Sequence, residues 1–217
     1  MRAAGIDVGA AAVHVAVVDD GAVVLARSFP ADELGAVVAM CAGAVRVGVD
    51  APAAPSVGAH VADPAWSGSA KFRSARCSEI AAGEQLGVWV PWVTPVGLEA
   101  CPPWMRTGFA VWSALAAAGL AAVEVFPGGS FWLLHGRRWP PKKSTAAGRA
   151  WRASVLGVPP SWSHDLLDAA MAAVVAASST PVVARHPGTG CDGSALWFPP
   201  APTPASVPPP RRACTSA

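Results

Sequence analysis

Carboxylate side chains recur at the ends of apolar segments along this chain. Asp7 lies in GIDVG, Asp50 in VGVDAP and Glu124 in VEVFP, each within or beside a short apolar run. Asp168 lies in HDLLDAAMAAVVAA, a segment with the composition of a buried helix. A buried carboxylate is costly unless it is paired, hydrogen-bonded, protonated or bound to a metal. Several such acids therefore indicate a shared role, and a divalent metal site is the simplest one.

The chemistry of such a site would be phosphodiester hydrolysis. Mg²⁺ takes hard oxygen ligands, often one or two carboxylates together with the phosphate oxygens of a substrate. Two ions about 4 Å apart stabilise both the attacking and the leaving oxygen during cleavage. We therefore expect Mg²⁺ or Mn²⁺ as the cofactor.

Three of the acids also have a purely structural explanation. Asp7 could cap the turn that follows it, and Asp50 could cap a turn at APAAP. Glu124 could pair with Arg138 or with a nearby lysine. These alternatives stay open on the sequence alone.

A further acid, Asp165, lies three residues before Asp168 on the same side of the expected helix. Any acid in a first helical turn gains up to ~1 kcal/mol from the helix dipole, which is a sufficient reason for Asp165. Asp168 lies beyond that turn and lacks this explanation. The Ala-rich face behind it would let the helix pack closely on a sheet, which predicts that Asp168 lies near Asp7 and Asp50.

Periodicity predicts the elements that would carry these acids. Alternating apolar residues on both sides of DDG predict a two-stranded β-hairpin within residues 3–29. Residues 52–105, rich in Gly, Pro, Ser and Trp, are expected to form loops with short helices. The other expected elements are helices over 31–44, 107–119, 144–157 and 163–178, and strands over 45–50 and 121–127. Strands that alternate with helices indicate an α/β fold with a mixed sheet.

Helix ends are predicted from capping residues. Thr107 is the expected N-cap of the helix over 107–119, and Gly119 is the expected residue just beyond its end. Ser144 or Thr145 would cap the next helix, and Ser163 the last one.

Length and composition predict one domain over residues 1–198, followed by a Pro-rich disordered tail over 199–217. The longest apolar run, Ala169–Ala177, is far shorter than the ~18 residues of a membrane span, and no signal peptide opens the chain. We therefore expect a soluble cytoplasmic protein that does not contact a membrane. The five cysteines form no CxxC pair and have no histidine at zinc-ligand spacing, which favours ordinary reduced thiols.

A basic and aromatic segment, FWLLHGRRWPPKKSTAAGRAWR, precedes the last helix. Cations interleaved with aromatic platforms suit a nucleic-acid backbone and unpaired bases. The alternative is that the tryptophans belong to the core and the cations to a solvated face. Arg73 and Arg76 of FRSARCSEI add to the positive charge, although an ion pair with Glu79 is equally compatible. The candidate substrate-binding residues are Arg73, Arg76, Arg138, Lys142, Lys143, Arg149 and Arg152.

The segments quoted so far, together with a late DGSALWFP, occur in an order that resembles domain of unknown function family 429, whose members are predicted RNase H-like nucleases. The order also resembles, more remotely, the Holliday-junction resolvase branch of the RNase H-like superfamily. In that branch an acid on the first strand, another on the fourth and a D-x-x-D on the last helix bind two Mg²⁺. The resemblance implies an RNase H-like mixed sheet flanked by helices. It implies metal ligands at Asp7, Asp50, Asp165 and Asp168, and catalytic roles for Asp7, Asp50, Glu124 and Asp168.

The chain departs from the family pattern at two places. The expected hairpin supplies two strands, whereas the superfamily usually has three antiparallel strands before the first helix. Gly128 and Gly129 stand where the family tends to carry an acid after E-x-x-P, which weakens the assignment of Glu124 as a further ligand or substrate contact.

Three functions are compatible with these features. The leading hypothesis is a metal-dependent nuclease that hydrolyses the phosphodiester bonds of DNA or RNA by a two-metal mechanism. The second is a non-catalytic module of the same fold that binds nucleic acid or a protein partner. The third takes GIDVG as the first phosphate loop of an actin-like or sugar-kinase ATPase, but CDGSAL, the nearest second phosphate motif, lies too close to the chain end.

Overall fold

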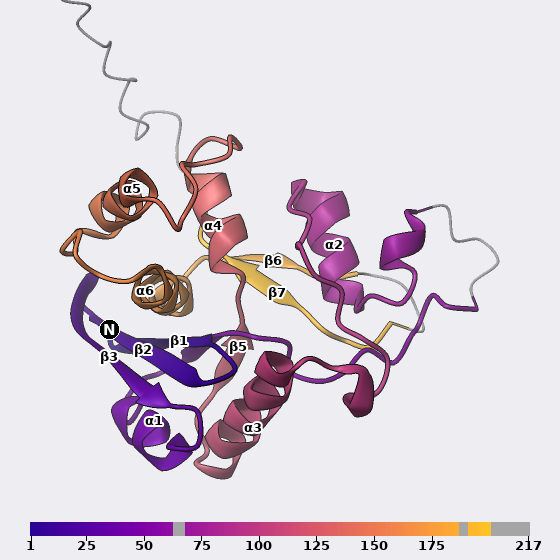
Figure 1. Ribbon diagram of the computed structural model, residues 1–217, viewed down its shortest axis with the longest axis horizontal. Helices are drawn as coiled ribbons and strands as arrows, with labels where there is room; N and C mark the ends of the chain where they lie inside the picture. The colour runs from indigo at the N-terminus through magenta and orange to yellow at the C-terminus, as the bar shows by residue number, and fades with distance from the viewer. Residues whose placement is uncertain (63–67, 187–190, 201–217) are drawn as a thin grey trace, which may run out of the picture.

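The computed structural model describes residues 1–62, 68–186 and 191–200 and contains a central five-stranded sheet (Figure 1). Its strands are β1 (Ala3–Val8), β2 (Ala12–Asp19), β3 (Ala22–Pro30), β4 (Val47–Asp50) and β5 (Ala122–Glu124), in the order β3-β2-β1-β4-β5. The first three strands are antiparallel, while β4 is parallel to β1 and β5 is parallel to β4. This mixed sheet with flanking helices confirms the predicted α/β fold class, with an antiparallel part, parallel strands and helices on both sides.

The two-stranded hairpin predicted over residues 3–29 is wrong in its strand count, because β1 precedes β2 and β3 as a third antiparallel strand. β1 is the central strand, and both of its faces are covered. A strand buried on both faces does not show the alternation of apolar and polar residues that marks a half-exposed strand. The sequence AAGIDV therefore carried little periodic signal.

Helices cover both faces of the sheet (Figure 1). Their bounds are α1 (Leu34–Met40), α2 (Cys77–Leu86), α3 (Pro103–Ala117), α4 (Pro127–Leu134), α5 (Ala146–Leu156) and α6 (His164–Ala177), with 3-10 turns η1 (Ala70–Phe72) and η2 (Leu98–Ala100). α1 and α3 pack on one face, where Ile6, Val15 and Leu115 are fully buried. α6 crosses the other face, with α5 packed on its outer side.

Several predicted helix ends are confirmed and one is wrong. Thr145 caps α5 by accepting from the Gly148 N–H at 3.0 Å, and Ser163 caps α6 by accepting from the Leu166 N–H at 3.2 Å. Gly119 has the left-handed φ of +69° expected just beyond a helix. α3, however, begins at Pro103 and not after Thr107, because proline is well suited to a first helical turn.

Three elements near the end of the fold were not predicted. α4 begins with Pro-Gly-Gly, and glycine is a poor helix former, so the segment resembles a loop. β6 (Val182–Ala184) and β7 (Leu196–Phe198) form a separate antiparallel pair and are only three residues long each.

Residues 201–217, most of the expected tail, lie outside the described residues. None of the helices in the described ranges has the length and apolar character needed to cross a bilayer.

Contact between α6 and the sheet is unusually close because both surfaces consist of small residues. A Cβ placed on Gly5 of β1 would lie 2.0 Å from the Ala173 nitrogen and 2.2 Å from the Ala169 oxygen. A Cβ on Gly48 of β4 would lie 2.4 Å from the Ala172 oxygen. The helix backbone therefore rests directly on two neighbouring strands, as the Ala-rich face predicted, and the start of α6 is held over the ends of these strands.

Candidate functional site

Asp7 and Asp50 lie side by side at the ends of two parallel strands. Asp7 of β1 is in register with Asp50 of β4 on one side and with His14 of β2 on the other. Residues in register share a sheet face, and Asp7 is two residues from Gly5, against which α6 packs. The three side chains therefore form a row across the sheet on the face that α6 covers. The acids of this site, Asp7, Asp50 and the nearby Asp168 of α6, are called the acid row below.

The carboxyl groups of Asp7 and Asp50 both have a raised pKa. Burial, together with the smaller effects of the nearby charges of Asp168 and Asp165, raises the pKa of Asp7 to about 8. Burial, followed by the charges of Asp7 and Asp168, also holds the pKa of Asp50 well above its usual range. A hydrogen bond between the two groups lowers the pKa of Asp7 and raises that of Asp50, which makes protonated Asp50 the donor.

Asp168 belongs to the second turn of α6 and is only 2 % exposed. Its Oδ1 accepts from Arg152 Nη1 at 2.5 Å, and its Oδ2 accepts from Lys143 Nζ at 2.7 Å. Burial alone would lower the pKa of Lys143, but the charges of Asp168, Asp7 and Asp50 raise it above its usual value. Both oxygens of Asp168 are thus occupied by cations from the basic segment.

Asp165, one turn earlier on α6, faces two histidines. Its Oδ2 lies 3.9 Å from His14 Nε2, and its Oδ1 lies 2.7 Å from His164 Nδ1. His14 Nδ1 is also hydrogen-bonded to Ser28 Oγ at 2.7 Å. Burial lowers the pKa of His14, and Asp165 offsets part of that effect. Asp165 therefore sits at the rim of the acid row, next to His14.

Glu124 does not lie with Asp7, Asp50 and Asp168. It is in register with Val49, one residue before Asp50, and so starts from the opposite face of the sheet. Arg76 Nη1 lies 2.7 Å from both of its carboxylate oxygens, and the Ala53 N–H donates to one of them at 3.2 Å. Burial raises the pKa of Glu124 to about 7 despite the charge of Arg76. Glu124 pairs with Arg76 and not with Arg138, the partner considered above.

The candidate cations divide into three groups. Lys142, Lys143 and Arg152 line one pocket, of about 330 Å³, together with Asp50 and Asp168. Arg76 is buried against Glu124, and its neighbour Glu79 accepts from the Arg76 backbone N–H and not from its side chain. The remaining candidates, Arg73, Arg138 and Arg149, do not line the pocket.

Aromatic rings form the other walls of this pocket, and they are Trp89, Trp92, Phe126, Trp132 and Trp139. Trp139 is 82 % exposed, so its ring is available at the mouth. Gly128 and Gly129 also line the wall, and a Cβ at Gly129 would lie 2.4 Å from the Val88 side chain. An acid at Gly129 would therefore require the Val88 side chain to shift.

Metal binding can be tested against the donor set of the acid row. Asp7, Asp50 and Asp168 offer hard carboxylate oxygens of the kind that Mg²⁺ and Mn²⁺ prefer. Within the described ranges, however, no three carboxylates have ligand atoms all within 4.8 Å of one another. The arrangement is an adjacent pair, Asp7 and Asp50, with Asp168 anchored separately.

The stability of the metal-free protein should depend on pH through this pair. The folded pKa of Asp7, about 8, lies above its model value of 3.8, so this stability is fully present below pH ~4 and is lost as pH rises through 8. Asp50→Asn keeps an N–H donor to Asp7 and removes one buried charge. We expect it to raise the free energy of unfolding by on the order of 2 kcal/mol at pH 9, with little effect at pH 3.5, below the unfolded pKa. Urea unfolding at both pH values measures this, with the exposed Asp32→Asn as the control. Equal changes at the two pH values would contradict it.

Sequence reasoning missed His14 and the pairing of Asp168 with its two cations. His14 could have been found from the register of β1 and β2, which places it opposite Asp7. Lys143 and Arg152 were expected to bind substrate, and no periodic pattern indicates that they reach Asp168 on another helix.

Comparisons with known proteins match part of the chain to one family model and find two similar solved structures. The model of the family described as "Protein of unknown function (DUF429)" matches residues 109–189, which confirms the resemblance to family 429. No curated protein matches the chain. Two solved structures are similar in fold, and both are RuvC from Thermus thermophilus. One, in complex with a Holliday junction substrate, is 14% identical over 80% of this chain and 91% of that chain, with a TM-score of 0.42. The other is 16% identical over 80% of this chain and 92% of that chain, with a TM-score of 0.40.

Proposed function

We propose that the protein is a metal-dependent nuclease that hydrolyses phosphodiester bonds in a nucleic acid. The observation that carries the proposal is the position of the acids. Asp50 and Asp168 line the same pocket as Lys142, Lys143 and Arg152, and Asp7 lies beside Asp50. The pocket thus combines acids that would bind metal ions with basic side chains that would bind phosphates.

Asp7, Asp50 and Asp168 would hold the divalent ions, with Asp165 at the rim. The ions would lower the pKa of a bound water and neutralise charge that develops on the phosphate. The residues themselves have separate tasks. Asp7 and Asp50, whose pKa values are both raised, must each be deprotonated before they can act as ligands, and Lys143 must leave one oxygen of Asp168. Arg152, buried beside that carboxylate, keeps Asp168 in place.

The pocket walls favour an unpaired base near the cleavage site. Stacking of a base on an aromatic side chain contributes about 1–3 kcal/mol and does not depend on base identity. Trp139 offers an exposed ring at the mouth, and Lys142 is exposed on the same wall. A phosphate of a single nucleic-acid strand could therefore contact the lysines while one of its bases stacks on Trp139. Single-stranded or locally opened nucleic acid is the expected substrate.

One observation favours the second candidate, a non-catalytic module that binds nucleic acid. Both oxygens of Asp168 are occupied by Arg152 and Lys143 at short distances. If Lys143 does not move, Asp168 remains neutralised and the pocket is only a binding surface. Replacement of Lys143 by methionine separates the two functions. A nuclease should then bind Mn²⁺ at least as tightly as before, whereas in a binding module Mn²⁺ affinity stays undetectable.

The experiment that tests the proposal is a cleavage panel. Purified protein is incubated with Mg²⁺ or Mn²⁺ and with labelled branched DNA, RNA–DNA hybrid, single-stranded DNA and single-stranded RNA. We expect cleavage of at least one substrate, which chelation by EDTA abolishes. Binding without cleavage across the whole panel would support the non-catalytic module instead.

Trp139→Ala provides a separate test of the stacking wall. Loss of one stacking platform should weaken binding of a single-stranded oligonucleotide by about 5- to 150-fold, and that of a fully paired duplex much less. Fluorescence anisotropy measures both affinities, in EDTA so that cleavage does not interfere. Leu25→Ala, at an exposed position on the distant edge strand β3, is the control. An equal loss for both nucleic acids would argue against base stacking.

A further inference from the structure

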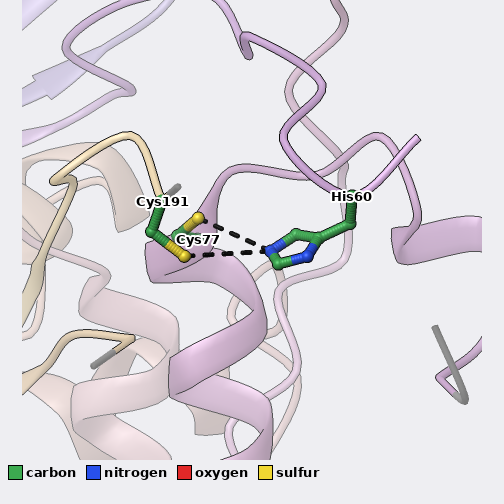
Figure 2. Close-up of side chains that lie close together, drawn as sticks. All are labelled: His60, Cys77 and Cys191. Atoms are coloured by element: carbon green, nitrogen blue, oxygen red, sulfur yellow. Dashed lines mark hydrogen bonds between the residues drawn. The ribbon is translucent and has the colours of Figure 1, made fainter. Parts of the chain in front are cut away.

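A second group of ligand-type side chains lies outside the acid site. Cys77 is the first residue of α2, His60 belongs to the loop before η1, and Cys191 precedes β7 (Figure 2). Among the described residues, these three form the only group of His, Cys, Asp or Glu whose ligand atoms all lie within 4.8 Å of one another. Figure 2 shows both sulfur atoms directed at the same ring nitrogen of His60.

The distances in this cluster match those around a tetrahedral zinc ion. With Zn–S about 2.3 Å and Zn–N about 2.0 Å, tetrahedral geometry separates a sulfur ligand from a nitrogen ligand by about 3.5 Å. His60 Nε2 lies 3.5 Å from Cys77 Sγ and 3.9 Å from Cys191 Sγ. Both sulfur atoms thus lie at or slightly beyond the separation from His60 Nε2 that a tetrahedral zinc site requires.

His186 lies outside this group of three but beside Cys191, and it is the candidate fourth donor. Its Nδ1 lies 3.2 Å from Cys191 Sγ, and its ring centroid lies 5.6 Å from that of His60. Two sulfur and two imidazole ligands form a Cys₂His₂ set, which in proteins holds zinc in closed structural sites. The sequence concealed this set, because its members lie far apart in the chain and do not follow the spacing of a zinc finger.

The surroundings of the cluster are fixed by further contacts. Asp192 accepts a hydrogen bond from the Cys77 backbone N–H at 3.3 Å and from the Ser194 N–H at 2.9 Å. Ser194 Oγ in turn accepts from the Ser78 N–H at 2.9 Å. The segment that carries Cys191 is thereby held against the start of α2.

We propose that His60, Cys77, His186 and Cys191 bind one Zn²⁺ ion in a structural site distinct from the acid row. The ion joins the loop around residue 60, the start of α2 and the segment before β7. α2 leads directly into residues 87–92, several of which line the pocket, so the ion stabilises one pocket wall. With four protein ligands the site has no open position, and it takes no part in hydrolysis.

Zinc content of the full chain tests this inference. Untagged protein purified from zinc-supplemented medium should contain about one zinc per chain by mass spectrometry of the metal. Cys77→Ser and Cys191→Ser should each reduce the content at least tenfold, while Cys101→Ser, at a buried cysteine outside the cluster, should leave it unchanged. Cobalt substitution of the wild-type protein should give the visible and thiolate-to-metal absorption of a tetrahedral site.

A chelation experiment covers the case in which a cysteine variant does not fold. Removal of zinc from the wild-type protein should lower its melting temperature, and added zinc should restore it. Failure of the nuclease proposal would leave these results unchanged, because no acid-row residue belongs to the cluster. The inference would be overturned by zinc-free protein that takes up no zinc on titration. It would also be overturned by zinc content that survives both cysteine replacements, or by a Cys77–Cys191 disulfide that persists in the presence of zinc.

Discussion

Asp7→Asn is expected to abolish Mn²⁺- and Mg²⁺-dependent cleavage, with a loss of at least about 100-fold in rate. Replacement of groups that only support metal ligands typically costs 10- to 100-fold, and a direct ligand should cost at least as much. Asp7 is central to the site, since it is in register with Asp50 and its pKa is raised by the charges of both Asp168 and Asp165. Gel-based cleavage assays measure the loss of cleavage rate, and calorimetric titration with Mn²⁺ separately measures the expected loss of metal affinity.

Two matched variants make this result specific. Asp32→Asn removes an exposed acid and should leave cleavage unchanged. Glu124→Gln removes a buried acid that is paired with Arg76 on the other side of the sheet, so it should lower stability while Mn²⁺ affinity is retained. If Asp7→Asn retains wild-type cleavage, or if Glu124→Gln abolishes Mn²⁺ binding and Asp7→Asn does not, the assignment of the metal ligands is wrong.

Gly5→Ala should destabilise the protein by about 3 kcal/mol or more, which corresponds to a fall in melting temperature of roughly 6–12 °C. The added Cβ would meet the backbone of α6 at Ala173 and Ala169, and backbone atoms cannot rotate out of the way. The helix must therefore move off the sheet, which also displaces Asp168 from Asp7 and Asp50. Thermal unfolding and Mn²⁺ titration of the same variant should both change.

Gly35→Ala is the matched control for this substitution. Gly35 lies in α1, is exposed, and has no atom within 4 Å of an added Cβ. The same change there should be neutral or stabilising by up to about 1 kcal/mol, because alanine is the better helix former. A Gly5→Ala variant that is as stable as Gly35→Ala would show that α6 does not rest on the sheet as described.

Local patterns allowed much of the fold to be predicted. The N-caps Thr145 and Ser163 and the left-handed Gly119 each depend on neighbouring residues alone, and all three are confirmed. The close contact of α6 with the sheet also follows from composition, because only small residues permit it. Asp168 could be singled out for the same reason, as an acid beyond the first turn of an otherwise apolar helix.

Features that depend on which sheet face or which distant segment a residue meets could not be predicted. Glu124 looks like its fellow acids in the sequence, but a register one residue away from that of Asp50 places it on the other face. Lys143 lies in a segment without regular structure, so its contact with Asp168 is set by the path of the chain alone. His60 and Cys191 are 131 residues apart and meet only because both lie against the start of α2.

The measurement that tests the central claim most directly is a crystal structure of the protein with Mn²⁺, in which anomalous scattering locates the ions. The proposed function predicts anomalous peaks between the carboxylates of Asp7, Asp50 and Asp168, with Lys143 moved from at least one oxygen of Asp168. Crystals at high Mn²⁺ concentration that show no peak at these carboxylates, with Lys143 still bonded to Asp168, would contradict it.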